Sequence, residues 1–140
     1  MLEGAAAGAP QTCLAFDFGT RRIGVATGNA LLAQGQARCT VNVVGTQHFD
    51  AIARLIDEWQ PAALVVGVPF HPDGAAHENT VKARRFARQL HGRFKLPVHE
   101  VDERYTTTEA LASGVADADA ESAAIILTQF FNQAHAASHA

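Results

Sequence analysis

The first 43 residues place three strand-like segments close together in the sequence. Residues 13–18 and 23–28 are short runs dominated by apolar and small side chains, and residues 36–43 form a weaker third run. The link between the first two, "GTRR", is far too short for the crossover that joins parallel neighbours. The three segments are therefore predicted to form an antiparallel meander, and the fold must contain such a sheet.

After this meander, helical and strand patterns alternate. A helical stripe of apolar residues ends at Pro61, and the run "ALVVGVP" has the unbroken apolar character of a buried parallel strand. A second helix is expected over residues 80–91, with Gly92 as the residue that follows its end. The segment "LPVHEVDER" then predicts a fifth strand. The apolar residues of the two helices are Ile52, Leu55, Ile56 and Trp59, then Ala83, Phe86, Ala87 and Leu90.

The end of the chain is predicted to be helical. Thr106 and Glu109 have the spacing of a capping box that opens a short helix, and a longer helix carries its apolar face from Ala123 to Phe131. The resulting order, βββαβαβαα, predicts an α/β protein with a mixed five-stranded sheet and helices on its faces. This is the RNase H-like arrangement. One domain is expected over residues 13–133, between flexible tails at 1–12 and 134–140.

Charge and cysteine content limit the classes of function. The formal net charge is −3, so any nucleic-acid-binding surface must be local. Cys13 and Cys39 form no metal or disulfide motif, and no apolar run reaches the ~18 residues of a membrane span. The start of the chain lacks the basic segment of a signal peptide. These features favour a cytoplasmic protein that does not bind membranes, either a monomer or a weak homodimer.

Carboxylates fall near the ends of three distant elements. Asp17 lies near the end of the first strand, the pair Asp102 and Glu103 at the end of the fifth, and Asp119 at the start of the last helix. Carboxylates that share a cleft repel one another, and a divalent cation relieves that repulsion. Mg²⁺, or Mn²⁺, prefers such hard oxygen ligands and can assist phosphodiester displacement. The alternative for Asp17 is that it accepts backbone N–H groups from the turn that follows.

Basic and small residues next to these acids indicate contacts with phosphate. Gly19 allows close approach of backbone, while Thr20, Arg21 and Arg22 carry a hydroxyl and positive charge, although "GTRR" also fits a plain hairpin turn. The helix at 80–91 has a basic side that fits a nucleic-acid backbone or an ordinary solvated surface equally well. Its basic residues are Lys82, Arg84, Arg85 and Arg88.

These motifs together resemble one family. The stretches "LAFDFGTRRIGVATG", "VVGVPFHPDG", "FARQL", "PVHEVDERYTTTEA" and "AESAAIIL" resemble the YqgF/RuvX family, in order and over about residues 13–131. The resemblance implies an RNase H-like fold and a nuclease that processes the 5′ end of pre-16S rRNA. It also implies a likeness to Holliday-junction resolvases. The expected partners are structured RNA, branched DNA and pre-ribosomal particles.

The resemblance also implies roles for individual residues. Asp17, Glu103 and Asp119 match the family's acids, and would be both catalytic and metal-binding. Gly19, Thr20, Arg21, Lys82, Arg85 and Arg104 are the candidate substrate-binding residues, although Arg104 equally fits a pair with a neighbouring acid. The segment "EALASGVADA" is shorter than the family's loop, which leaves Asp117, Asp119 and Glu121 as candidates for the third acid. Helix geometry favours Asp119, since it lies about 20° from Ile126 around an ideal helix, against about 140° for Glu121.

Other functions fit parts of the same sequence. "DFGT" resembles the phosphate-binding turn of actin-like ATPases and sugar kinases, but those proteins pair two such domains and this chain has one. A Holliday-junction resolvase acting on DNA is a second alternative. The third is a ribosome-assembly or transcription factor that binds nucleic acid without cleaving it.

Overall fold

A computed structural model describes residues 12–69, 73, 75–76, 78–103 and 118–138. Its strands and helices follow the predicted order up to the fifth strand. The elements are β1 (Thr12–Phe18), β2 (Arg22–Asn29), β3 (Gln34–Asn42), α2 (Gln47–Trp59), β4 (Ala63–Val68), α3 (Glu78–Phe94), β5 (Val98–Asp102) and α5 (Ala118–Ser138).

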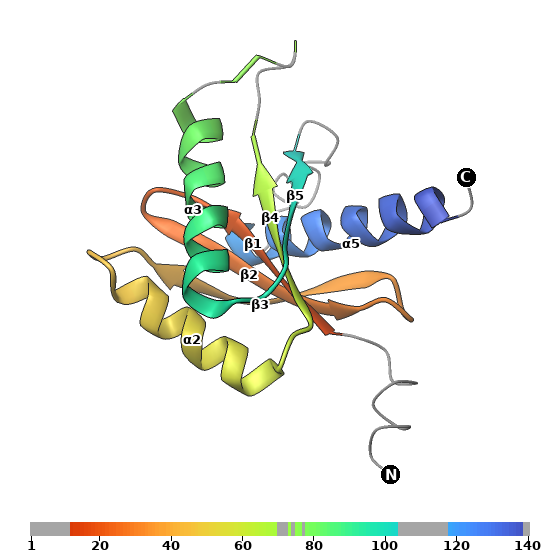
Figure 1. Ribbon diagram of the computed structural model, residues 1–140, viewed down its shortest axis with the longest axis horizontal. Coiled ribbons are helices and arrows are strands. Elements are labelled where there is room, and N and C mark those ends of the chain that lie inside the picture. Colours follow the sequence, from red (N-terminus) through yellow and green to blue (C-terminus); the bar gives the residue numbers. More distant parts are fainter. Residues whose placement is uncertain (1–11, 70–72, 74, 77, 104–117, 139–140) are drawn as a thin grey trace.

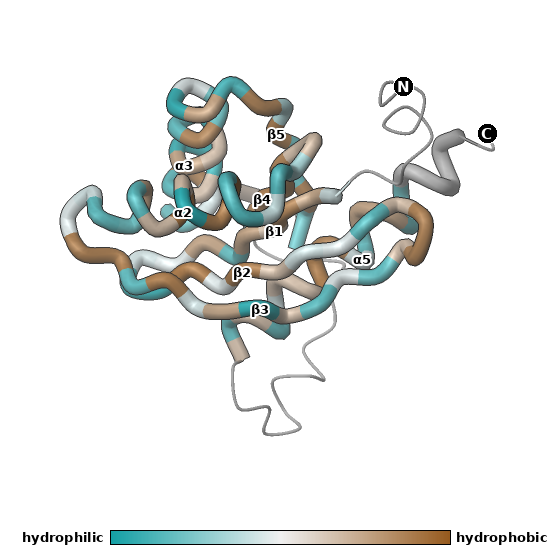
Figure 2. Tube along the Cα trace, turned by 90° about the horizontal axis from the view of Figure 1, so that it is seen from below, coloured by the Kyte–Doolittle hydropathy of each residue, from teal (hydrophilic) through white to brown (hydrophobic). Residues whose placement is uncertain are grey.

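The five strands form one mixed sheet, as predicted. Their order is β3-β2-β1-β4-β5, with β1 antiparallel to β2 and parallel to β4. Helices α2 and α3 cover one face of this sheet, and α5 crosses the other face over β1, β2 and β3 (Figure 1). The view turned by 90° shows the same layers, with α2 and α3 on one side of the strands and α5 on the other (Figure 2).

Alternation along β1 gives each face its own core. Leu14 and Phe16 are fully buried against α2 and α3, where Phe16 meets the ring of Phe86 edge-on at 5.8 Å between centroids. Cys13 and Ala15 belong to the core beneath α5, with Ile126 and Leu127 among their neighbours in that cluster. Because side chains alternate along a strand, Asp17 must lie on the α5 face.

Two predicted ends differ from the structure. Gly92 is not the residue after the second helix, because α3 continues to Phe94, and Lys95 takes the left-handed conformation with φ of 59°. The Lys95 N–H donates to the His91 carbonyl at 3.0 Å, which closes the helix without a glycine. At the other end, α5 runs to Ser138 and so includes residues predicted to be tail. The capping box at 106–109, Arg104 and Asp117 lie outside the described residues.

Two further properties concern the cysteines and the helices. Cys13 and Cys39 are both free; Cys13 is a core residue as predicted, whereas Cys39 is only half-buried. Across the part of the chain that the structure describes, no helix has the length and apolar character required to cross a membrane.

Candidate active site

The site lies on the α5 face, at the end of the sheet where β1, β4 and β5 terminate. Asp17 is the last residue but one of β1, and in the register it pairs with Gly24 of β2 on one side and Gly67 of β4 on the other. A carboxylate in the middle strand is thus flanked by two residues without side chains. This leaves room above the sheet for groups from other elements.

Each of these glycines makes space for one of the other predicted acids. A Cβ on Gly67 would lie 2.7 Å from Oε1 of Glu103 and 2.4 Å from Cδ1 of Ile126. A Cβ on Gly24 would lie 1.8 Å from the backbone carbonyl oxygen of Asp119, at the start of α5. The sheet can therefore bring Glu103 and Asp119 close to Asp17 only because both strands carry glycine at these positions.

Asp17 and Glu103 form a hydrogen-bonded pair of carboxyl groups. Burial, the hydrogen bond to Asp17, and the charges of Asp17 and Asp102 together raise the pKa of Glu103 to about 9. Burial also raises the pKa of Asp17, while the hydrogen bond from Glu103 works in the opposite direction. At neutral pH Glu103 therefore keeps its proton, and its O–H group donates a hydrogen bond to the Asp17 carboxylate.

Two residues near the start of α5 complete these contacts. The charge of Asp119 further raises the pKa of Asp17, and a hydrogen bond from the Ser122 side chain lowers it. Asp119 itself accepts a hydrogen bond from Nε of Arg22, at 2.8 Å from its Oδ2. Glu103 therefore contacts Asp17 directly, and Asp119, whose charge acts on Asp17, already has a cationic partner.

The donor set suits a divalent cation in its chemistry. Two half-buried carboxyl groups whose pKa values are raised by desolvation and by neighbouring charges would both ionise more readily beside a cation. Hard oxygen ligands of this kind fit Mg²⁺ or Mn²⁺. Within the described residues, however, no group of three or more His, Cys, Asp or Glu side chains is arranged to hold a metal ion.

The turn after β1 contains three of the predicted phosphate-binding residues. A Cβ on Gly19 would lie 2.5 Å from the backbone carbonyl oxygen of Arg22, so Gly19 is required for the tight turn itself. Thr20 and Arg21 are exposed beside the site. Their role in binding phosphate stays a prediction.

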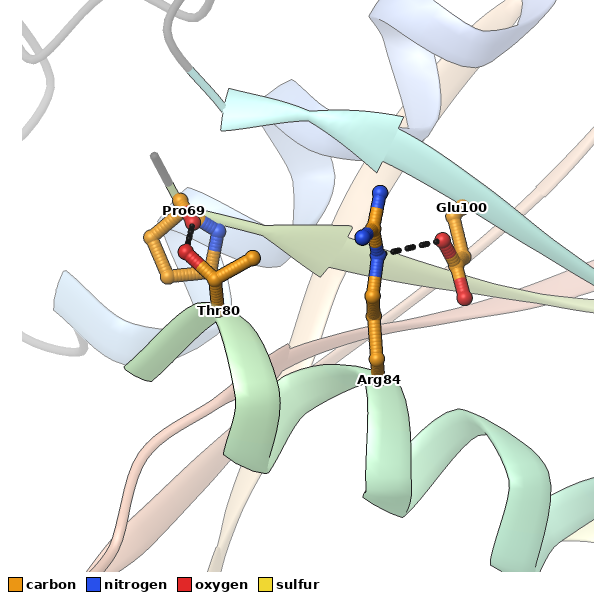
Figure 3. Close-up of polar contacts among 4 residues, drawn as sticks. All are labelled: Pro69, Thr80, Arg84 and Glu100. Atoms are coloured by element: carbon orange, nitrogen blue, oxygen red, sulfur yellow. Dashed lines mark hydrogen bonds and ion pairs between the residues drawn. The ribbon is translucent and has the colours of Figure 1, made fainter. Parts of the chain in front are cut away.

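Helix α3 places its basic residues on the opposite face of the sheet from Asp17. Lys82 forms an ion pair with Glu78 at 2.9 Å, and Arg85 is exposed. Arg84 pairs with Glu100 of β5 at 3.3 Å (Figure 3). The predicted substrate-binding residues Lys82 and Arg85 are therefore not brought to the carboxylates.

The start of α3 nevertheless lies at the same end of the sheet as the site. The Thr80 hydroxyl donates a hydrogen bond to the carbonyl of Pro69, which directly follows β4 (Figure 3). The two faces of the sheet are therefore close to each other at this end, where β4 stops and α3 begins.

Two residues of the site, Gly24 and Ser122, are not among those predicted from the sequence. Arg22 is predicted to present its charge to phosphate, and in the structure its Nε contacts Asp119. For Gly24 a signal was present, since a glycine inside a strand often marks a close approach of another backbone. No sequence pattern indicated the contacts of Arg22 and Ser122.

A family model matches most of the chain. The model described as "RuvX: Holliday junction resolvase" covers residues 11–133. This range contains every described strand and most of α5, together with Asp17, Glu103 and Asp119.

Curated relatives carry the same name in several bacteria. A protein of Albidiferax ferrireducens named "Putative pre-16S rRNA nuclease" is 67% identical over 120 residues, which is 86% of this chain and 77% of that protein. The protein of the same name in Polaromonas sp. is 62% identical, over 86% of this chain and 87% of its own length. One from Paraburkholderia phytofirmans is 52% identical, over 90% of this chain and 91% of its own length.

Solved structures support the fold. Thermus thermophilus RuvC in complex with a Holliday junction substrate superposes with a TM-score of 0.56 at 16% identity, over 90% of this chain and 96% of that one. Pelota of Archaeoglobus fulgidus superposes with a TM-score of 0.51 at 10% identity, covering 98% of this chain and 38% of its own. At these identities the likeness concerns the arrangement of strands and helices.

Proposed function

The chain belongs to the RuvX family, and from this premise we propose that it is a nuclease that hydrolyses phosphodiester bonds in the precursor of 16S rRNA. Relatives that are 67%, 62% and 52% identical to this chain over the aligned residues are named for that substrate. Its role would be in ribosome biogenesis, on pre-ribosomal particles in the cytoplasm.

One observation supports this proposal more than any other. Asp17, Glu103 and Asp119 come from three distant segments, and the pKa of Asp17 responds to both of the other two. A protein that needed only a stable core would gain nothing from burying carboxyl groups together, because desolvation and mutual repulsion both cost free energy. Such an arrangement is typical of a site that binds a cation or transfers protons.

Asp17 and Glu103 are the residues that would hold a divalent cation, with Asp119 as a third ligand. When bound, Mg²⁺ or Mn²⁺ would stabilise charge on the phosphodiester oxygens and lower the pKa of a water molecule. The protein's own contribution is to hold these carboxyl groups close together, at positions that depend on the absence of a side chain at Gly24 and Gly67. Thr20 and Arg21 would bind the phosphate beside the cleavage site.

Branched DNA is the second candidate substrate. The matching family model is described as a Holliday junction resolvase, and RuvC, whose fold is similar, has been solved with a Holliday junction. The same carboxylates would serve hydrolysis of either nucleic acid. The identity of the substrate therefore depends on surfaces beyond the site.

A cleavage assay with two substrates tests the proposal. The purified protein is incubated with an end-labelled precursor fragment that spans the 5′ end of 16S rRNA, and separately with a four-way DNA junction, each with Mg²⁺ and with EDTA. We expect Mg²⁺-dependent cleavage of the RNA. Cleavage of the junction alone would favour the second candidate. Metal-independent binding without cleavage of either would favour a non-catalytic factor.

A further inference from the structure

The ion pair between Arg22 and Asp119 joins the start of β2 to the start of α5. Arg22 is the first residue of β2, two residues before Gly24. Side chains two residues apart on a strand share a face, and Gly24 is the partner of Asp17 in the register, so Arg22 lies on the α5 face with Asp17. Ile23, between Arg22 and Gly24, is buried in the core on the other face. Its guanidinium Nε reaches Oδ2 of Asp119 at 2.8 Å.

The pair is accessible to water and to ions. The Arg22 side chain is 61% exposed and that of Asp119 is 35% exposed. Ion pairs at such exposure contribute little to stability, because solvent competes for both partners. Neither residue is therefore committed to this contact, and a stronger ligand can replace either one.

Two such ligands are expected at this position if the proposed function holds. A divalent cation at the carboxyl groups competes with Arg22 for Asp119, because both are positive and both bind its oxygens. A phosphodiester brings oxygens that a guanidinium binds with two parallel hydrogen bonds. After such an exchange Asp119 would bind the cation and Arg22 would bind the phosphodiester, so each charged group would still have a partner of opposite charge.

We propose that Arg22 is a positioning residue that neutralises Asp119 in the metal-free protein and passes to a substrate phosphate when a divalent cation takes Asp119. This inference rests on the proposed function for the identity of the phosphate ligand. It gives a role to the ion pair of Asp119 with Arg22 beside a carboxyl group, Asp17, on which the charge of Asp119 acts. Arg22, the last residue of "GTRR", would then leave Asp119 only when a divalent cation binds there.

The first test is the affinity for Mn²⁺ in the absence of nucleic acid, measured by isothermal titration calorimetry. Arg22→Gln removes the competitor, and we expect it to tighten Mn²⁺ binding by about three- to tenfold. The matched control is Arg21→Gln, which removes the same charge from the adjacent exposed residue and should change the affinity by less than about twofold. Equal effects of the two variants, or no tightening by Arg22→Gln, would overturn the exchange.

The second test is binding of the labelled precursor fragment by fluorescence anisotropy, with EDTA and with Ca²⁺ as a divalent ion of hard-oxygen preference. Arg22→Gln should weaken RNA binding by less than about twofold in EDTA, where Arg22 is held by Asp119, and by at least about fivefold in Ca²⁺. Equal losses in both conditions would make Arg22 a simple phosphate contact and overturn the proposal. The exposed Arg54→Gln on α2 is the control.

The two tests separate this inference from the proposed function. The Mn²⁺ titration contains no RNA, so it judges the competition for Asp119 even if the protein does not cleave precursor rRNA. Arg22→Lys keeps the charge without Nε, and its Mn²⁺ affinity should lie between those of the wild type and Arg22→Gln. Thermal unfolding of each variant confirms that the fold is intact.

Discussion

The backbone carbonyl oxygen of Asp119 lies against Gly24, so closely that a Cβ on the glycine would be 1.8 Å from it. Gly24 is also the partner of Asp17 in the antiparallel register. One position without a side chain thus determines how near α5 comes to the central carboxylate. The geometry of the site depends on this contact between sheet and helix as much as on the acids themselves.

Gly24→Ala is expected to destabilise the protein, because the new methyl group meets backbone atoms that cannot move without shifting α5. We expect the free energy of unfolding to fall by about 2–3 kcal/mol, measured by urea denaturation. Gly92→Ala is the matched control, since nothing lies within 4 Å of a Cβ there and the residue is inside α3. It should leave stability unchanged or raise it by up to about 1 kcal/mol. If Gly24→Ala is as stable as Gly92→Ala, α5 does not pack on Gly24.

Glu103→Gln is expected to stabilise the metal-free protein at alkaline pH. Burial, the hydrogen bond to Asp17 and the charges of Asp17 and Asp102 together raise the pKa of Glu103 from 4.5 to about 9, so its protonated form is favoured in the fold. The resulting stabilisation is complete below the unfolded-state pKa near 4.5 and is lost as the pH rises toward 9. Glutamine has no proton to lose, so the variant should gain on the wild type by up to about 4 kcal/mol between pH 5 and pH 8.

Chemical denaturation of both proteins in EDTA at pH 5 and pH 8 measures this difference. The control is Glu58→Gln, which changes an exposed glutamate of α2 and should track the wild type at both pH values. Parallel stability of wild type and Glu103→Gln across this range would mean that Glu103 is not held protonated beside Asp17.

The third acid can be identified by kinetics. Asp119→Asn should reduce the cleavage rate more than about a hundredfold, because the Asp119 carboxylate lies close enough to Asp17 for its charge to raise the pKa of Asp17. Glu121→Gln, in the same first turn of α5, should stay within about threefold of the wild type, and so should Asp117→Asn. Single-turnover cleavage rates on the precursor fragment compare the three variants. Loss of activity in Asp117→Asn alone would assign the third acid to that residue instead.

Most of the architecture could be predicted because it follows from local patterns. The short links require the antiparallel meander, and the period of the apolar residues gave α2, α3 and α5 their inner faces. Asp17, Glu103 and Asp119 could be assigned to one end of the sheet because each lies at the end of an element. The end of α3 was missed since Lys95, and not a glycine, takes the left-handed conformation.

The contacts across the site could not be predicted in the same way. The ion pair between Arg22 and Asp119 joins residues 97 positions apart, and its existence depends on how α5 crosses β2. Likewise, the sequence predicted a basic side on α3 but not the layer in which it lies. Lys82 and Arg85 are on the face away from Asp17, a result of handedness and packing that no periodicity reveals.

The central claim is that Asp17 is the carboxylate on which hydrolysis depends. It is tested most directly by the single-turnover rate at which Asp17→Asn cleaves the end-labelled precursor 16S fragment in Mg²⁺, beside the wild type. We expect the variant to lose more than about a hundredfold in rate while its melting temperature in EDTA stays equal to or above that of the wild type, since a buried charge has been removed. A rate within about threefold of the wild type would contradict the account.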